Sequence, residues 1–224
     1  AEAVRHPLLA DAVPNDYAAC GASWLVTGSN MSGKSTFLRT VGVNAVLART
    51  IHTCRARRWE GGTFSVRSCI GRSDSILEGK SYYLTEVEVV RALLDASRTA
   101  DPQLFILDEL FRGTNTIERI AAARAVLESL DTGPHLVLVA THDIELLRWL
   151  SPRYEAWHFR EQIVEGELVF DYRLRAGPSS TRNAVALLRH MAYPEDVVRL
   201  AEATVEEEER APGTQSGAAA RPTP

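Results

Sequence analysis

The sequence predicts an α/β fold in which a mainly parallel sheet is covered by helices on both faces. WLVT at 24–27, LFIL at 104–107 and LVLVAT at 136–141 are continuous apolar runs, with no alternation of apolar and polar residues. Such runs are typical of strands that are buried on both faces. Segments with helical spacing of apolar residues separate the runs. Strands that alternate with helices in this way favour a parallel sheet.

The first half of the chain supplies two of these strands and two helices. A glycine-rich loop follows WLVT, and apolar residues then recur at helical spacing. Residues 52–72 are irregular and rich in arginine, which predicts loops around a short strand. A helix is expected over 81–100, because the Asp-Pro pair at 101–102 disfavours a further helical turn.

The second half continues the pattern and then changes it. A helix is expected at about 117–130, between LFIL and LVLVAT. The stretches EAWHFREQI and ELVFDYRL flank a Glu-Gly turn at 165–166, which predicts a terminal hairpin.

Two helices, near 181–191 and 194–209, are expected to close the fold. The last residues, 211–224, are small, polar and rich in proline, which is typical of a disordered tail. We therefore expect a single domain over residues 1–210.

Composition narrows the classes of function. Of the 224 residues, 45% are hydrophobic, and the net charge of −4 argues against a domain that holds nucleic acid through bulk positive charge. The chain has no run of 18 apolar residues, and its first residues lack the layout of a secretory signal. Three cysteines without metal-ligand spacing fit reduced thiols. We therefore expect a cytoplasmic protein without direct membrane contact, and expect that any contact with DNA is local or made through regions outside this chain.

The glycine-rich loop carries the strongest chemical signal. GSNMSGKS at 28–35 fits the pattern G-x-x-x-x-G-K-[ST] between a strand and a helix, the setting in which this motif cradles phosphates. Lys34 is expected to bridge β- and γ-phosphate oxygens, and the Ser35 hydroxyl to ligate Mg²⁺. The expected nucleotide-binding residues are Gly28, Ser29, Asn30, Met31, Ser32, Gly33, Lys34, Ser35 and Thr36.

Acids and a histidine follow the other two strands. Asp108 ends LFIL and is expected to hold Mg²⁺, while Glu109 is placed to orient and deprotonate the attacking water. His142 follows LVLVAT and is expected to sense the γ-phosphate. Ligands of open α/β sheets bind beyond the carboxyl ends of the strands, so these residues are predicted to share one crevice.

A second Gly-Lys-Ser, at 79–81, is not a second phosphate loop, because the residues before it, SDSILE, contain no glycine and follow no clear strand. Ser81 can instead cap the helix that begins there. This helix end is interpreted in two ways: Ser81 only caps the helix, or the capped end also binds an anion.

These stretches together resemble the ATPase domain of the MutS family. The resemblance lies in TGSNMSGKSTFLR at 27–39 and in five further stretches in the family's order, namely RHPLL, VPND, SDSILEGKSYYLTEV, LDELFRGTNT and VATHDIELL. It covers about residues 5–200, and other phosphate-loop ATPases share only the first motif and generic acids. It implies a P-loop NTPase fold of the ABC-ATPase group and hydrolysis of Mg-ATP.

The resemblance also implies how the site is completed. In that group two protomers enclose two nucleotides, so a homodimer is expected. Ser81 would then contact, in trans, the γ-phosphate held by the partner's Lys34. Val13 lies where the family packs the adenine, and RGTNT at 112–116 resembles the loop by which each protomer senses the other's site. The implied function is that of the ATPase domain of a MutS-related DNA repair protein.

Three departures from the family leave alternatives open. Phe111 stands where mismatch-repair members commonly have Gly, Ser29 replaces their loop Pro, and TRNA at 181–184 replaces Ser-Tyr-Gly, so the DELFRGTN form resembles a less studied branch. The alternatives are an ABC-type ATPase of another genome-maintenance or membrane-tethered protein, and a nucleotide-dependent assembly module. The arginines at 55, 57 and 58 are interpreted either as a solvated loop or as a contact to DNA or a second protomer.

Overall fold

The computed structural model describes residues 1–19, 21–71, 82–150, 152–164, 167–179 and 184–210. The chain divides into two compact units, Ala1–Gln162 with Val169–Thr181 and Ile163–Leu168 with Arg182–Pro224. The expectations on Ser81, on the Glu-Gly turn at 165–166 and on the tail at 211–224 lie outside the described residues.

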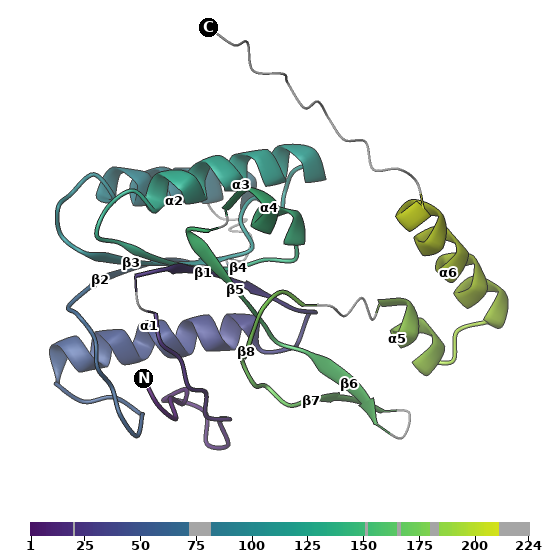
Figure 1. Ribbon diagram of the computed structural model, residues 1–224, viewed down its shortest axis with the longest axis horizontal. Helices are drawn as coiled ribbons and strands as arrows, with labels where there is room; N and C mark the ends of the chain where they lie inside the picture. The colour runs from purple at the N-terminus through teal and green to yellow at the C-terminus, as the bar shows by residue number, and fades with distance from the viewer. Residues whose placement is uncertain (20, 72–81, 151, 165–166, 180–183, 211–224) are drawn as a thin grey trace, which may run out of the picture. The chain divides into compact units, whose positions relative to one another are not determined.

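The first unit is built on a six-stranded sheet in the order β2-β3-β4-β1-β5-β8 (Figure 1). Its first five strands are parallel, and β8 runs antiparallel to β5. The strands are β1 (Ser23–Thr27), β2 (Ser65–Cys69), β3 (Gln103–Asp108), β4 (Leu136–Ala140), β5 (Tyr154–His158) and β8 (Arg175–Ala176). The predicted mixed α/β fold with a mainly parallel central sheet is confirmed.

The apolar runs fill two cores, one on each face of the sheet. Along β3, Phe105 and Leu107 point into one core while Leu104 and Ile106 point into the other, and β1 and β4 alternate in the same way. Both faces are therefore buried, which explains why these strands show no polar alternation.

Helices cover both faces (Figure 1). The helix α1 (Lys34–Thr50) packs on one face, while α2 (Tyr82–Ala96), α3 (Thr116–Leu130) and α4 (Leu147–Leu150) pack on the other. A 3₁₀ turn, η2 (Ile144–Leu146), precedes α4. The helix expected at 81–100 thus ends at Ala96, a few residues before Pro102.

The expectation of a long terminal hairpin is wrong in one part. Its first strand divides, because Tyr154–His158 forms β5, which pairs in parallel with β1 along the whole of Ser23–Thr27. Only β6 (Glu161–Val164) and β7 (Glu167–Phe170) form the two-stranded sheet. The side chains of β5 are mostly half-buried, so its sequence lacks the fully apolar signal of its neighbours.

In the second unit, α5 (Ala184–His190) and α6 (Glu195–Arg210) pack together, and Arg189 forms an ion pair with Glu202 at 3.0 Å. Within the described part of the chain, no helix combines the length and apolar character needed to cross a bilayer.

Candidate nucleotide site

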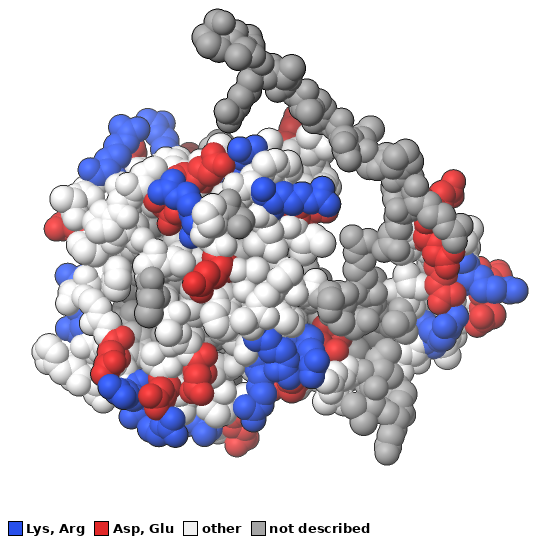
Figure 2. All heavy atoms as spheres, in the orientation of Figure 1, with Lys and Arg blue, Asp and Glu red and all other residues white. Residues whose placement is uncertain are grey.

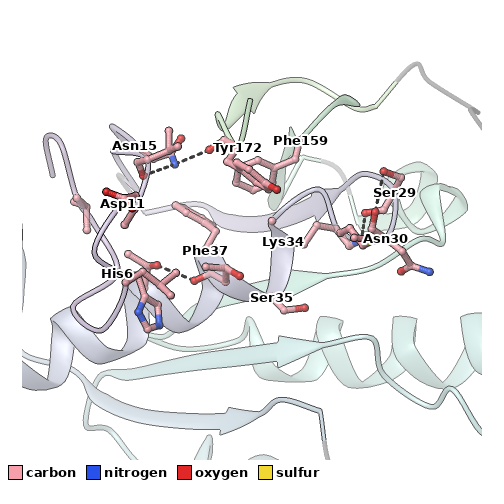
Figure 3. A pocket seen from close by; sticks show the side chains of 18 of the residues that line it. His6, Asp11, Asn15, Ser29, Asn30, Lys34, Ser35, Phe37, Phe159 and Tyr172 are labelled. Atoms are coloured by element: carbon pink, nitrogen blue, oxygen red, sulfur yellow. Dashed lines mark hydrogen bonds between the residues drawn. The ribbon is translucent and has the colours of Figure 1, made fainter. Parts of the chain in front are cut away.

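The carboxyl ends of three adjacent strands meet at one edge of the sheet. In the order β3-β4-β1, these ends carry Asp108 with Glu109, then His142, then the loop that starts at Gly28. The loop lines a cavity of about 440 Å³ together with the N-terminal segment, α1 and the side chains of Phe159 and Tyr172 (Figure 3). The structure therefore gathers the predicted residues of the three strands at one place.

The loop needs its two outer glycines. Gly28 has φ +137°, and a Cβ there would lie 2.6 Å from the Phe159 carbonyl oxygen. Gly33 has φ +109°, and a Cβ there would lie 3.2 Å from the ring of Tyr172. Gly33 is also the N-cap of α1 and provides no side-chain cap. The first backbone N–H groups of α1 therefore need other acceptors, and anions bind well at such helix ends.

Lys34 reaches back over this loop. It is only 4% exposed, and its Nζ donates to the carbonyl oxygens of Gly28 and Ser29, each at 2.9 Å. Burial lowers the pKa of Lys34, and the carboxylates of Glu109 and Asp108 oppose that shift. A buried ammonium held by carbonyl oxygens can exchange them for phosphate oxygens, which carry negative charge and form stronger, charge-assisted hydrogen bonds.

The Glu109 carboxylate is held by two side chains, those of His142 and Arg112. Its Oε1 lies 2.9 Å from His142 Nε2, and its Oε2 accepts a hydrogen bond from Arg112 Nε at 2.5 Å. Burial alone would raise the pKa of Glu109, but the hydrogen bonds from His142 and Arg112 outweigh it and lower the pKa to about 2. The carboxylate is therefore ionised throughout the physiological pH range.

His142 joins three parts of the site. Its Nε2 also lies 2.9 Å from Asn30 Oδ1 and 3.3 Å from Lys34 Nζ. The next residue, Asp143, accepts two hydrogen bonds from Arg119 on α3, at 2.7 and 2.9 Å. This ion pair fixes the backbone that carries the imidazole.

Asp108 is suited to a cation. Its Oδ1 is buried and has no hydrogen-bond partner among the residues that the structure describes. In that same part of the chain, no three His, Cys, Asp or Glu side chains are arranged to hold a metal ion by themselves. Mg²⁺ commonly uses one or two protein ligands together with phosphate oxygens and water. The donor set of Asp108 and the half-buried Ser35 hydroxyl fits such a shared site.

The end of the cavity away from Lys34 is formed by the N-terminal segment, which carries His6 and Asp11 (Figure 3). Val13 also lines the cavity, and its packing against an adenine stays a prediction. Asn15 ties this segment to the chain that follows β7. Its Nδ2 donates to the Tyr172 carbonyl oxygen at 3.0 Å, and its Oδ1 accepts from the Leu174 N–H at 2.7 Å. These bonds position Tyr172, which has φ +53° and lines the cavity.

The arginines at 55, 57 and 58, in the loop that follows α1, have partners within the chain. Arg55 donates to the carbonyl oxygens of His6 and Leu9 at 3.0 and 2.7 Å, and so fixes the segment that walls the cavity. Arg57 binds Glu2 at 2.6 Å, and Arg58 binds Glu60 at 2.5 Å. Arg55 is therefore a structural residue of the cavity wall, an interpretation that neither alternative from the sequence included.

Sequence reasoning missed further residues near the loop. The Ser29 hydroxyl donates to Glu161 Oε2 at 2.8 Å, and Glu161 is only 4% exposed. Asn15, Arg55 and Glu161 act through partners that are distant in the chain, so no local pattern marks them. The replacement of the family's loop proline by Ser29 was the one available signal, because it introduces a hydroxyl donor.

Known proteins resemble the chain over most of its length. The family model of MutS domain V matches residues 24–209. The DNA mismatch repair protein MutS of Thermus thermophilus is 36% identical over 203 residues, which are 89% of this chain and 25% of that protein. The protein of the same name from Sorangium cellulosum is 37% identical over 185 residues, which are 80% of this chain and 20% of that protein. The chain thus spans about a quarter or less of the length of these relatives.

Proposed function

Because the chain belongs to the MutS family through domain V, we propose that it binds and hydrolyses Mg-ATP as the ATPase domain of a MutS-related DNA repair protein. One observation carries the proposal: Lys34 and Glu109 line a cavity of about 440 Å³ beside the open N-terminus of α1, and the Asp108 carboxylate interacts electrostatically with Lys34. Ligand pockets in proteins commonly have volumes of this order.

Each residue has a definite task in this proposal. Lys34 exchanges its two carbonyl acceptors for phosphate oxygens, and the N–H groups of the loop bind the same anion. Asp108 and Ser35 hold Mg²⁺, which neutralises charge on the phosphates when it is bound. Glu109 orients the attacking water and accepts its proton, for which the carboxylate must first exchange a present partner. His142 monitors the γ-phosphate from β4.

A second copy of the chain would complete the site through Ser81, as the family resemblance implies. Two exposed apolar side chains support an interface near the loop and near α3. Met31 in the phosphate loop is 81% exposed, and Ile117 in the first turn of α3 is 82% exposed. Burying such side chains against another protein surface is favourable.

DNA would be bound outside this chain. On the face shown in Figure 2, basic and acidic side chains are interspersed, and the whole sequence carries a net charge of −4. A phosphate backbone is usually held by a clearly basic surface. We therefore assign ATP chemistry to this domain and DNA recognition to other regions of the protein.

Two variants and one control test the ATPase proposal. Glu109→Gln should reduce single-turnover ATP hydrolysis by about 100-fold or more while nucleotide binding is retained. Lys34→Ala should weaken nucleotide binding about 10- to 100-fold, because charge-assisted hydrogen bonds to phosphate are lost. Glu128→Gln, which changes an acid on the outer part of α3, should leave both measurements unchanged. Normal hydrolysis by Glu109→Gln would show that the assigned base is wrong.

The dimer is tested by the molar mass in solution, measured with and without a slowly hydrolysed ATP analogue. Glu109→Gln with ATP should double in mass, whereas Lys34→Ala should stay at its nucleotide-free mass. A mass that does not respond to nucleotide in either protein would contradict the composite site.

A further inference from the structure

Glu86 is a buried acid on α2 that contacts the loop carrying Glu109. Its side chain lies outside the cavity, and the residue is only 4% exposed. Oε1 accepts a hydrogen bond from the Phe111 backbone N–H at 2.6 Å. Oε2 is buried without a hydrogen-bond partner among the described residues. Burial raises the pKa of Glu86, and the Phe111 hydrogen bond and the Arg112 charge oppose that shift. The Phe111 N–H is therefore the backbone group that this acid holds.

The contacted loop has a backbone conformation that needs support. Glu109 has φ +55° and Phe111 has φ +60°, both in the left-handed region that non-glycine residues rarely adopt. Such residues persist when surrounding contacts hold them. The Glu109 N–H donates to the Ala140 carbonyl oxygen at 2.9 Å, and the Phe111 N–H donates to Glu86. The two left-handed residues are thus fixed from different sides, by β4 and by α2.

Packing at the start of α2 strengthens this link. The Tyr83 and Phe111 rings lie 6.3 Å apart, and a Cβ on Gly113 would come within 3.2 Å of Tyr83 Cβ. Phe111 is 5% exposed, so its ring is fixed in the core. The first turns of α2 and the loop of residues 109–113 therefore form one packed unit, in which the Glu86 bond sets the backbone direction.

We propose that Glu86 is the positioning residue for the Glu109 carboxylate. By holding the Phe111 N–H, it keeps the loop in the conformation that directs Glu109 toward Lys34 and His142, 3.9 and 2.9 Å away. This proposal rests on the proposed function, because the positioned group is the base of ATP hydrolysis. Misplacement of a reacting group by about 1 Å can reduce a rate about 100-fold.

Two substitutions of similar volume separate the hydrogen bond from packing. Glu86→Met fills the site but removes the acceptor, whereas Glu86→Gln retains an acceptor oxygen for the Phe111 N–H. Glu88→Gln, an exposed acid two residues along α2, is the control. For Glu86→Met we expect single-turnover hydrolysis to fall about 10- to 100-fold with nucleotide affinity within about threefold of wild type. Glu86→Gln should hydrolyse within about threefold of wild type.

Hydrogen exchange of the Phe111 amide in the nucleotide-free protein provides a readout that does not depend on hydrolysis. Glu86→Met should accelerate this exchange about tenfold or more, and Glu86→Gln should not. Unchanged exchange in Glu86→Met overturns the positioning role, as does full hydrolysis by that variant. Equal losses of rate and affinity in both variants also overturn it, because they indicate packing alone. Absence of hydrolysis in the wild type instead refutes the proposed function, and the exchange experiment then still decides whether Glu86 holds the loop.

Discussion

Removal of the Asn15 side chain should weaken nucleotide binding without disturbing the phosphate loop. Asn15→Ala deletes the bonds to the Tyr172 carbonyl oxygen and the Leu174 N–H, at 3.0 and 2.7 Å. The backbone bonds between Asn15 and Val4, at 2.9 and 3.0 Å, remain. The N-terminal segment should therefore stay in place while the segment around Tyr172 becomes less ordered.

The size of this effect follows from the two lost hydrogen bonds. Each is worth about 0.5 to 1.5 kcal/mol, and partial exposure places the sum at about 1 to 2 kcal/mol. In the variant, nucleotide binding must also order the segment around Tyr172, so the binding free energy becomes less favourable by this sum of about 1 to 2 kcal/mol. Affinity should then fall about 5- to 30-fold.

Equilibrium titration with a slowly hydrolysed ATP analogue measures this loss, and thermal unfolding gives the stability of the same sample. Tyr172→Phe is the matched control, because Asn15 bonds to the backbone of Tyr172 and the ring is retained. The reasoning is refuted if Asn15→Ala binds the analogue as tightly as wild type. It is also refuted if Tyr172→Phe loses as much affinity as Asn15→Ala.

Two other measurements test the loop of residues 109–113. Phe111→Gly should lower the free energy of unfolding, measured by urea denaturation, by about 2 to 4 kcal/mol. The loss of a buried ring outweighs the relief of the left-handed φ, so a variant more stable than wild type would contradict this reasoning. The pKa of Glu109 is lowered to about 2, so its ionisation stabilises the fold above the ordinary pKa and this contribution is lost as pH falls toward 2. Between pH 5 and pH 2, the free energy of unfolding of wild type should therefore fall by up to about 3 kcal/mol more than that of Glu109→Gln. If the two proteins lose stability in parallel over this range, the Glu109 carboxylate makes no such contribution.

The parts of the fold that sequence predicts are those with a strong local signal. β1, β3 and β4 are buried on both faces, and their continuous apolar runs indicate this directly. The strand β5 pairs with β1 but is only half-buried along most of its length, so its mixed sequence suggests a hairpin. Its place in the sheet depends on pairing with a strand about 130 residues earlier, which no local pattern reveals.

The same distinction holds for the candidate site. Lys34, Asp108, Glu109 and His142 each lie in or next to a recognisable strand or loop, and the structure brings them together. In the sequence, Arg55 is indistinguishable from its neighbours Arg57 and Arg58, because all three lie in one charged stretch. Only the fold distinguishes it, because its carbonyl acceptors lie more than 40 residues away in the N-terminal segment.

The left-handed conformation of Phe111 bears on one departure from the family resemblance. A backbone with φ +60° is a conformation that glycine adopts easily, which agrees with the glycine that the family resemblance implies at this position. In this chain the benzyl group is accommodated because it lies in the core beside Tyr83. Contacts that only the folded protein supplies therefore compensate for an unfavourable local preference.

The contacts of Lys34 determine what an empty site costs the protein. The Lys34 ammonium donates to the carbonyl oxygens of Gly28 and Ser29, so departure of a nucleotide would not leave a buried charge without partners. The phosphate loop would therefore keep its conformation without nucleotide, and the next nucleotide would bind to a preformed loop. In the ATPase cycle proposed above, Lys34 would exchange its oxygen ligands at each turnover, and no folding step would be required.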